Sequence, residues 1–310
     1  MHDELKGWLE WLGIENPELK ALCGDASSRR YYRLQEPKSI VMDASDDKKV
    51  VPRFIGVAML LQQFKVRLPQ IKAFEQHKGF MLLEDVGSTH LFDKLEAKNA
   101  SLYYDKAIKE LVKIQKTPSK GLDPYDAMFL LEEMNLMSQW YIKEHLGRTV
   151  ECVEGRTLLG AFALISKEVL SQPQEIFVHR DYHSRNLMID KNDNIVVIDF
   201  QDAKSGALTY DLVSLLRDAY VELDDAEIQR LVLLFKELKG LEVEDETFLR
   251  WFDFTGLQRH IKILGIFSRL SIRDGKDGYL DDIPLVLKYV LDICEKYPEL
   301  DGLAHILKPE

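Results

Sequence analysis

The sequence has 310 residues, a formal net charge of −11 and 46% hydrophobic residues. This length and composition allow two domains with a core each, and the acidic balance argues against nucleic acid or an anionic membrane as a general partner. The three cysteines are far apart and odd in number, which predicts neither a zinc site nor a disulfide framework. No apolar run approaches the roughly 18 residues of a membrane span. We therefore expect a cytoplasmic protein, a monomer or weak dimer, with no nucleic-acid or membrane partner.

The first third of the chain is predicted to mix helices and strands. Apolar residues recur at helical spacing over residues 5–12 and 51–64. Two apolar runs, residues 39–43 and 80–87, have the length and composition of strands, and the second ends in a polar step and a glycine. Together these patterns indicate a small lobe with a sheet.

A loop of small residues, 24–28, precedes the β-rich run that starts at Arg29. Small side chains let backbone N–H groups approach a phosphate closely. Ser27 and Ser28 would add hydroxyl groups there, and Arg29 or Arg30 would add positive charge. An ordinary hairpin turn explains the loop equally well when it is considered alone.

From residue 102 onward the pattern is helical. Apolar residues at three- and four-residue spacing predict helices over residues 104–115, 130–145 and 158–170, and residues 228–307 continue in the same way. Within that last stretch, Gln258, Arg259, His260 and Lys262 interrupt an otherwise apolar segment. We expect Lys262 to lie on a solvated face and the adjacent Arg259 and His260 to be candidates for binding a hydroxylated or anionic substrate.

Residues 176–200 carry the strongest chemical signal in the chain. Short β-branched and aliphatic runs alternate with polar loops there, and Asp181, Asn186 and Asp199 fall where extended chain gives way to loop. Carboxylate and carboxamide oxygens suit Mg²⁺, and one carboxylate is left to act as a base. The spacing of His179-Arg180-Asp181, Asn186 and Asp199-Phe200 is typical of the catalytic loop and metal aspartate of the protein-kinase superfamily.

With these motifs in place, the chain resembles the aminoglycoside phosphotransferase/choline kinase-like superfamily. Within it, the chain is most similar to the anomeric N-acetylmuramate/N-acetylglucosamine kinases of bacterial cell-wall recycling. The resemblance extends from Gly24 to about Tyr279. It rests on GDASSRRYYRL (24–34), IVMDAS (40–45), LLEDVG (82–87), EEMNLMSQWYIKEHLG (132–147), VHRDYHSRNLM (178–188), VIDFQDAKSGALTYDLVSLLRD (197–218) and GLQRHIKILGIFSRL (256–270).

The resemblance implies an α+β, bilobal protein-kinase-like fold. Residues 1–86 would form the nucleotide-binding lobe with an antiparallel sheet, and residues 87–310 a larger, mainly helical lobe for catalysis and substrate binding. The short segment between Asp199 and the next helix leaves no room for a long activation loop, which favours a small-molecule kinase over a protein kinase.

The resemblance also implies ATP and Mg²⁺ as cofactors and a sugar as the small-molecule partner, phosphorylated on its C1 hydroxyl. Asp181 would orient and deprotonate that hydroxyl, while Asn186 and Asp199 would hold Mg²⁺. The remaining assignments are Ser27, Ser28, Arg29, Glu84 and Val86 for nucleotide binding; Arg259, His260, Gln201 and Asp202 for the sugar; and His179, Arg180 and Asp211 for structural support, with Asp211 also expected to cap the helix that it opens.

One feature departs from the general kinase pattern. The strand over residues 39–43 normally ends in a lysine that contacts the α- and β-phosphates, but here Met42 or Asp43 takes that place. The candidates for a replacement cation are Lys48, Lys49, Arg53 and the Arg29–Arg30 pair.

Three alternatives stay open at this point. The first is a kinase for a cationic acceptor such as choline or an aminoglycoside, lined by Glu132, Glu133, Asp224 and Asp225. The second is a catalytically silent nucleotide-binding module, suggested by the absent strand lysine. The third is a zinc site at His179 and His183, which lacks a third ligand at a suitable spacing.

Overall fold

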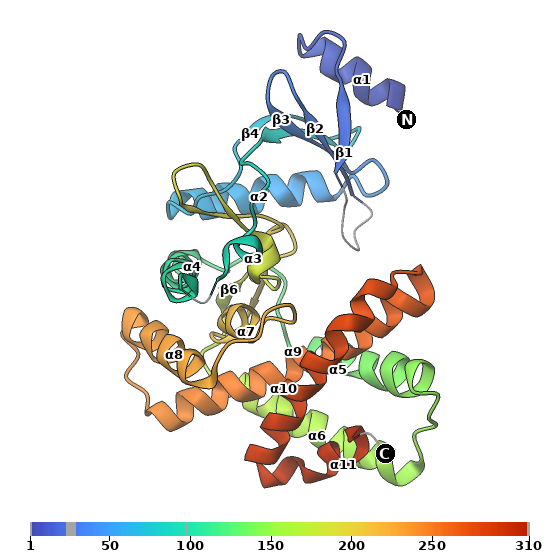
Figure 1. The fold of residues 1–310 in the computed structure, drawn as a ribbon, viewed down its shortest axis with the longest axis vertical. Coiled ribbons are helices and arrows are strands. Elements are labelled where there is room, and N and C mark those ends of the chain that lie inside the picture. Colours follow the sequence, from blue (N-terminus) through green and yellow to red (C-terminus); the bar gives the residue numbers. More distant parts are fainter. Residues whose placement is uncertain (1, 23–28, 97, 309–310) are drawn as a thin grey trace. The chain divides into compact units, whose positions relative to one another are not determined.

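The computed structural model describes residues 2–22, 29–96 and 98–308. These residues form two compact units (Figure 1): unit 1 is Met1–Lys94 with Arg185–Asp202, and unit 2 is Leu95–Ser184 with Ala203–Glu310. The expected α+β fold with an antiparallel N-terminal sheet and a mainly helical remainder is confirmed. The predicted boundary between the two lobes, after residue 86, stays a prediction. The compact units divide the chain differently, because residues 87–94 and 185–202 also belong to unit 1.

Unit 1 is built on a five-stranded antiparallel sheet in the order β1-β2-β3-β5-β4. The strands are β1 (Leu19–Leu22), β2 (Arg30–Leu34), β3 (Ser39–Asp43), β4 (Ile71–Glu75) and β5 (Phe80–Glu84). Helix α1 (His2–Trp11) covers one face, where its residues Leu5, Trp8 and Leu9 pack against Tyr32, Leu34, Val41, Phe80 and Leu82. Because side chains alternate along a strand, the neighbouring residues Tyr31, Ile40 and Leu83 point to the opposite face.

A hairpin from the second half of the sequence completes unit 1. Its strands are β7 (Leu187–Ile189) and β8 (Ile195–Val197). Two backbone hydrogen bonds tie it to the first 94 residues: Ile189 N–H donates to the Thr89 carbonyl at 2.9 Å, and Val197 N–H donates to the Arg67 carbonyl at 2.9 Å. Helices α2 (Val50–Gln63) and α3 (Leu91–Lys94) belong to the same unit.

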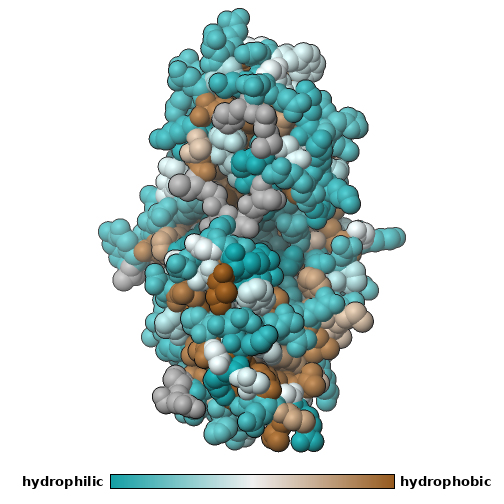
Figure 2. All heavy atoms as spheres, turned by 90° about the vertical axis from the view of Figure 1, so that its right-hand side faces the viewer, coloured by the Kyte–Doolittle hydropathy of each residue, from teal (hydrophilic) through white to brown (hydrophobic). Residues whose placement is uncertain are grey.

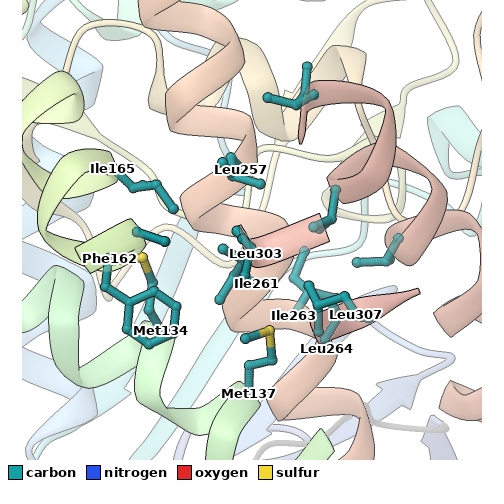
Figure 3. Packing of buried hydrophobic residues seen from close by; sticks show 14 of the residues in the cluster. Met134, Met137, Phe162, Ile165, Leu257, Ile261, Ile263, Leu264, Leu303 and Leu307 are labelled. Atoms are coloured by element: carbon teal, nitrogen blue, oxygen red, sulfur yellow. The ribbon is translucent and has the colours of Figure 1, made fainter. Parts of the chain in front are cut away.

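Unit 2 is a helical body with one short two-stranded sheet, β6 (Ile176–Val178) and β9 (Lys204–Gly206). Buried side chains from several helices meet around α9 (Figure 3), among them Met134, Met137, Phe162, Ile165, Leu257 and Leu264. The helices are α4 (Ala100–Ile114), α5 (Ala127–Leu136), η1 (Met137–His145), α6 (Cys152–Leu170), α7 (Tyr210–Leu216), α8 (Asp225–Lys239), α9 (Asp245–Asp274), α10 (Ile283–Lys296) and α11 (Asp301–Leu307), with short 3₁₀ turns η3 (Asp277–Asp282) and η4 (Pro298–Leu300). A further 3₁₀ turn, η2 (Ser184–Asn186), begins in unit 2 and ends in unit 1.

Helix α9 is the central element of unit 2. It approaches the junction of α5 with the π-helical segment η1 so closely that a Cβ on Gly265 would lie 2.3 Å from the Leu136 carbonyl carbon and 2.5 Å from Met137 N. A glycine is therefore required at this crossing. Contrary to our expectation, Lys262 on the same helix is buried and not solvated, because the helix is surrounded by other elements over most of its length.

On the face shown in Figure 2, hydrophilic residues dominate and hydrophobic ones are scattered among them. Within the described ranges, no helix combines the length and the hydropathy that a membrane span requires.

Candidate active site

The loop between β6 and β7 holds the kinase-like motif. It begins after Val178, passes through Asp181 and ends in the 3₁₀ turn Ser184–Asn186. Arg180 (φ +79°) in this loop, and Asp199 (φ +63°) after β8, both adopt left-handed backbone conformations. Such conformations are uncommon for residues other than glycine and concentrate at functional sites.

Two buried aspartates hold this loop from within unit 2. Asp211 accepts hydrogen bonds from the backbone N–H groups of His179 (2.7 Å) and Arg180 (3.0 Å). Asp218 accepts from Ser184 N–H at 2.9 Å and from the Ser184 hydroxyl. The loop is thus fixed at both ends by carboxylates that lie after it in the sequence.

The expectation that Asp211 caps a helix is wrong. The residue at the N-cap of α7 is Thr209, and Asp211 lies within the first turn, where its side chain is turned toward the catalytic loop. Desolvation raises the pKa of Asp211 to about 6, although the two N–H donors and the nearby His179 act in the opposite direction.

Asp181 lies in a strongly cationic environment. Its carboxylate is 42% exposed, yet protein atoms surround it densely, and desolvation acts to raise its pKa. The positive charges of Lys262 and Arg259 outweigh that effect, with further contributions from His183 and Arg180, so the pKa is held well below its usual range. Asp181 is therefore ionised at neutral pH and can accept a hydrogen bond or a proton.

Two of the cations around Asp181, Lys262 and Arg180, are held by a buried carboxylate, that of Glu133 on α5. Glu133 is 3.2 Å from Lys262 Nζ and 3.1 Å from an Arg180 Nη atom, and the Tyr125 hydroxyl also donates to it. Lys262 donates in addition to the Tyr210 hydroxyl at 3.0 Å. This cluster of Glu133, Lys262, Arg180 and the two tyrosines was missed by sequence reasoning, because its members come from distant segments.

Arg259 and His260 lie side by side on α9 but have different surroundings. Arg259 is 4.0 Å from an Asp181 carboxylate oxygen and 3.5 Å from the Arg180 carbonyl, both long contacts, and its Nε has no partner among the described residues. His260 instead donates from Nε2 to the Arg217 carbonyl at 2.9 Å and stacks on Tyr289. Burial lowers the pKa of His260 to about 3, so its ring is neutral.

Unit 1 contains a cavity of about 370 Å³ on the sheet face opposite α1. Sheet residues such as Tyr31, Ile40 and Leu83 line it on one side, and Asn186 and Asp199 line it as well. The predicted nucleotide residues Arg29, Glu84 and Val86 also line this cavity. The other two, Ser27 and Ser28, lie outside the described residues.

The segment Glu84–Gly87 enters this cavity from β5. The Glu84 side chain is held by Arg67, with a 2.8 Å hydrogen bond from Nη1, and by the Gln70 N–H at 3.1 Å. No hydrogen bond to the Val86 N–H occurs within the described part of the chain. The N–H groups of Glu84 and Gly87 and the Gly87 carbonyl are already paired. The Val86 N–H is thus the donor in this segment that can pair with a ligand.

Asp199 is surrounded by hydrogen-bond donors. One of its carboxylate oxygens accepts from an Arg29 Nη atom at 2.9 Å and from Gln201 Nε2 at 3.0 Å. Gln201 also donates to Asp202 at 3.0 Å. The residues predicted to bind the sugar are therefore divided, with Gln201 and Asp202 beside Asp199 in unit 1 and Arg259 and His260 in unit 2.

The donor set in unit 1 fits Mg²⁺. Asn186 and Asp199 supply hard oxygen atoms to one cavity, and Asp199 already has a positive charge, that of Arg29, against its carboxylate. Mg²⁺ is commonly bound by one or two protein oxygens together with phosphates and water. Asp181 belongs to unit 2, and its approach to such a metal stays a prediction.

Comparison with known proteins places these residues in context. The model of the phosphotransferase enzyme family matches residues 18–247. The chain belongs to the phosphotransferase enzyme family. Curated relatives named N-acetylmuramate/N-acetylglucosamine kinase include one from Neisseria meningitidis serogroup B, 36% identical and covering 98% of this chain and 94% of its own, and one from Pseudomonas aeruginosa, 37% identical and covering 97% and 90%.

Solved structures confirm the fold of this phosphotransferase. The aminoglycoside phosphotransferase APH(2'')-Ib in its ADP-bound form aligns over 94% of this chain and 99% of its own with a TM-score of 0.65 and 14% identity. A choline/ethanolamine kinase family protein from Mesorhizobium loti aligns over 99% and 98% with a TM-score of 0.67 and 13% identity. At these identities the likeness concerns the fold alone.

Proposed function

We propose that this phosphotransferase is an ATP- and Mg²⁺-dependent kinase that phosphorylates the anomeric hydroxyl of N-acetylmuramate and N-acetylglucosamine, in the recycling of peptidoglycan. The observation that carries the proposal is the identity of 36–37% to kinases of that name over nearly the whole chain. The presence of Asp181, Asn186 and Asp199 at catalytic spacing supports it. Because ATP is the donor, we place the reaction in the cytoplasm.

The nucleotide would bind in the cavity of unit 1. The Glu84 carbonyl and the Val86 N–H would pair with the edge of the adenine, as main-chain groups of a kinase hinge do, and Arg29 with the serines at positions 27 and 28 would contact the phosphates. Asn186 and Asp199 would hold Mg²⁺, which would neutralise part of the negative charge of the phosphates. The cavity volume of about 370 Å³ lies at the lower end of the range for small-molecule sites.

Asp181 would orient the C1 hydroxyl and receive its proton. Because neighbouring cations hold its pKa low, Asp181 is a weak base, and positioning would contribute more than proton abstraction. An anomeric hydroxyl is more acidic than an ordinary alcohol, which reduces the basicity that is needed. His179, Arg180 and Asp211 would support the loop, through the hydrogen bonds described above.

The charges around Asp181 favour an anionic or neutral acceptor over a cationic one. Glu133, which could have bound a cationic acceptor, is already paired with Lys262 and Arg180. Arg259 has long contacts and a partnerless Nε, so its guanidinium has donors to offer to a carboxylate. N-acetylmuramate carries a carboxylate in its lactyl group, whereas N-acetylglucosamine has none. His260, Gln201 and Asp202 would contribute polar contacts to the sugar.

A screen for acceptor-dependent ADP release tests the proposal. The acceptors are N-acetylmuramate, N-acetylglucosamine, glucose, choline and kanamycin, each measured with and without Mg²⁺, and phosphorus NMR of the product identifies the modified hydroxyl. We expect Mg²⁺-dependent turnover with the two N-acetylated sugars and a sugar 1-phosphate as the product. Preferred turnover of choline or kanamycin would establish the alternative kinase class, and nucleotide binding without any turnover would indicate a silent module.

A further inference from the structure

The side of β3 that faces the cavity carries no lysine in this protein. In β3, Ile40 lines the nucleotide cavity, and Met42, two residues on, shares its face of the sheet and is fully buried. Protein kinases pair that lysine with a glutamate on the helix beside the sheet. Here α2 instead contributes Phe54, which lines the cavity and packs on Phe200 with ring centroids 4.6 Å apart. Both members of the ion pair are thus replaced.

Other cations near the cavity have partners of their own, and two of them, Arg33 and Arg185, also line it. Arg33 forms an ion pair with Asp85 at 2.9 Å and donates to the Gly87 carbonyl at 2.7 Å. Arg53 is half-exposed and pairs with Asp47 and Asp202, outside the cavity lining. Lys48 and Lys49 are exposed and do not line the cavity. Arg185 lines it, with its guanidinium stacked over Phe92 at 5.1 Å.

Arg29 differs from all of these in its contact with a metal-binding candidate. Its side chain is 10% exposed, it lines the cavity, and an Nη atom lies 2.9 Å from Asp199. That Asp199 oxygen also accepts from Gln201. A guanidinium therefore contacts one of the two carboxylate oxygens of Asp199, the residue expected to hold Mg²⁺.

We propose that Arg29 replaces the strand lysine and exchanges places with the metal. Without nucleotide, Arg29 neutralises Asp199. With Mg²⁺ and ATP bound, Asp199 would hold the metal and Arg29 would turn to the phosphates, which would replace Asp199 as its anionic partner. The inference rests on the proposed function in so far as ATP and Mg²⁺ are taken as the ligands.

The exchange has a thermodynamic consequence. Two cations on one carboxylate repel each other, so Arg29 weakens the binding of a metal alone, and phosphates that draw Arg29 away remove the competition. Metal and nucleotide should then bind cooperatively, and by linkage each raises the affinity for the other by the same factor. Loss of Arg29 should tighten metal binding and weaken nucleotide binding, two effects of opposite sign.

Binding measurements on the full chain without an acceptor test this inference. Mn²⁺ replaces Mg²⁺ and is followed by its EPR signal, and AMP-PNP binding at saturating Mg²⁺ is followed by calorimetry. For Arg29→Gln we expect Mn²⁺ without nucleotide to bind at least about fivefold more tightly, in line with typical coupling between sites. AMP-PNP should bind about ten- to a hundredfold more weakly, the effect of losing a hydrogen bond between charged groups. Adenosine affinity should not change.

Arg30→Gln is the matched control, because Arg30 is held by Asp43, Ser45 and Asp46 and does not line the cavity. This substitution should leave the dissociation constants for Mn²⁺ and for AMP-PNP within about twofold of the wild-type values. If Arg29→Gln does not fold, as judged by circular dichroism, Arg29→Met takes its place with the same expectations. Unchanged or weaker Mn²⁺ binding in the Arg29 variant, or AMP-PNP binding equal to wild type, would overturn the exchange. Neither result depends on which sugar is the acceptor.

Discussion

The Lys262 ammonium group lies 3.2 Å from a Glu133 carboxylate oxygen inside unit 2, and both side chains are buried. Lys262 also attracts Asp181 electrostatically and contributes to its low pKa. Glu133 thus compensates a cation that acts on the proposed catalytic residue. The contact between α5 and α9 at this pair therefore affects the pKa of Asp181 in the loop after β6.

Removing the charge of Glu133 should destabilise the protein. Glu133→Gln leaves Lys262 and Arg180 buried without their carboxylate, and breaking a buried pair in this way typically costs about 3 kcal/mol or more. Chemical denaturation measures the free energy of unfolding. Glu132→Gln is the control, since Glu132 is exposed on the same helix turn, and it should change stability by less than about 0.5 kcal/mol. Equal effects of the two substitutions would contradict the role given to the buried pair.

Two glycines on α9 should respond oppositely to alanine. Gly265→Ala places a methyl group within 2.3 Å of the Leu136 backbone, so we expect the melting temperature to fall markedly. At Gly256 the nearest atom to such a Cβ is 3.6 Å away, an ordinary contact. Gly256→Ala should therefore be neutral or stabilise the helix by up to about 1 kcal/mol. Thermal unfolding of both variants checks the close crossing, which would be refuted if Gly265→Ala were as stable as Gly256→Ala.

Asp211 should make stability depend on pH in a defined window. Its pKa is raised from 3.8 to about 6 in the folded chain, chiefly by desolvation, so the folded state binds this proton more tightly than the unfolded state does. The resulting stabilisation is complete below about pH 4 and is lost as the pH rises through 6. The unfolding free energy of the wild type minus that of Asp211→Asn should therefore decrease by about 2–3 kcal/mol between pH 4 and pH 7.

The measurement is chemical denaturation across this pH range. Asp123→Asn, at an exposed carboxylate, is the control and should show no comparable trend. A difference that grew with pH would mean that Asp211 is stabilised in its charged form.

Much of the fold followed from local patterns. The strand predicted over residues 39–43 is present with the same ends, and the helix predicted over residues 51–64 is present with each end shifted by one residue. The helix predicted over residues 158–170 forms the C-terminal two thirds of α6, which begins earlier, at Cys152. The kinase-like spacing around Asp181 identified the family that the comparisons show. Such features depend on periodicity and on residues close together in the sequence.

Other features depend on contacts between distant segments and could not be predicted. The change from α5 to the π-helix η1 occurs at Met137, the point at which Gly265 of α9 crosses, and the periodicity of residues 130–145 gives no sign of it. Lys262 was expected in solvent because its partners, Glu133 and Tyr210, lie far away in the sequence. Asp218, which holds Ser184, carried no local signal that separates it from an ordinary surface aspartate.

Arg259 should discriminate between the two proposed sugars. If its guanidinium binds the lactyl carboxylate, Arg259→Gln should lower kcat/KM for N-acetylmuramate about tenfold or more beyond its effect on N-acetylglucosamine. Arg250→Gln, which removes a partly exposed arginine bonded to Glu168 and Glu299, is the control. An equal loss of kcat/KM for both sugars would mean that Arg259 acts only through Asp181 and does not bind the lactyl carboxylate.

The central claim is that Asp181 acts in phosphoryl transfer and not in nucleotide binding. The most direct test compares Asp181→Asn with the wild type in acceptor-dependent ADP release and in AMP-PNP affinity. We predict that kcat falls by about a thousandfold or more, in keeping with the loss of a positioned base, while the dissociation constant for AMP-PNP stays within about threefold. A variant that retained kcat close to the wild-type value would contradict the account.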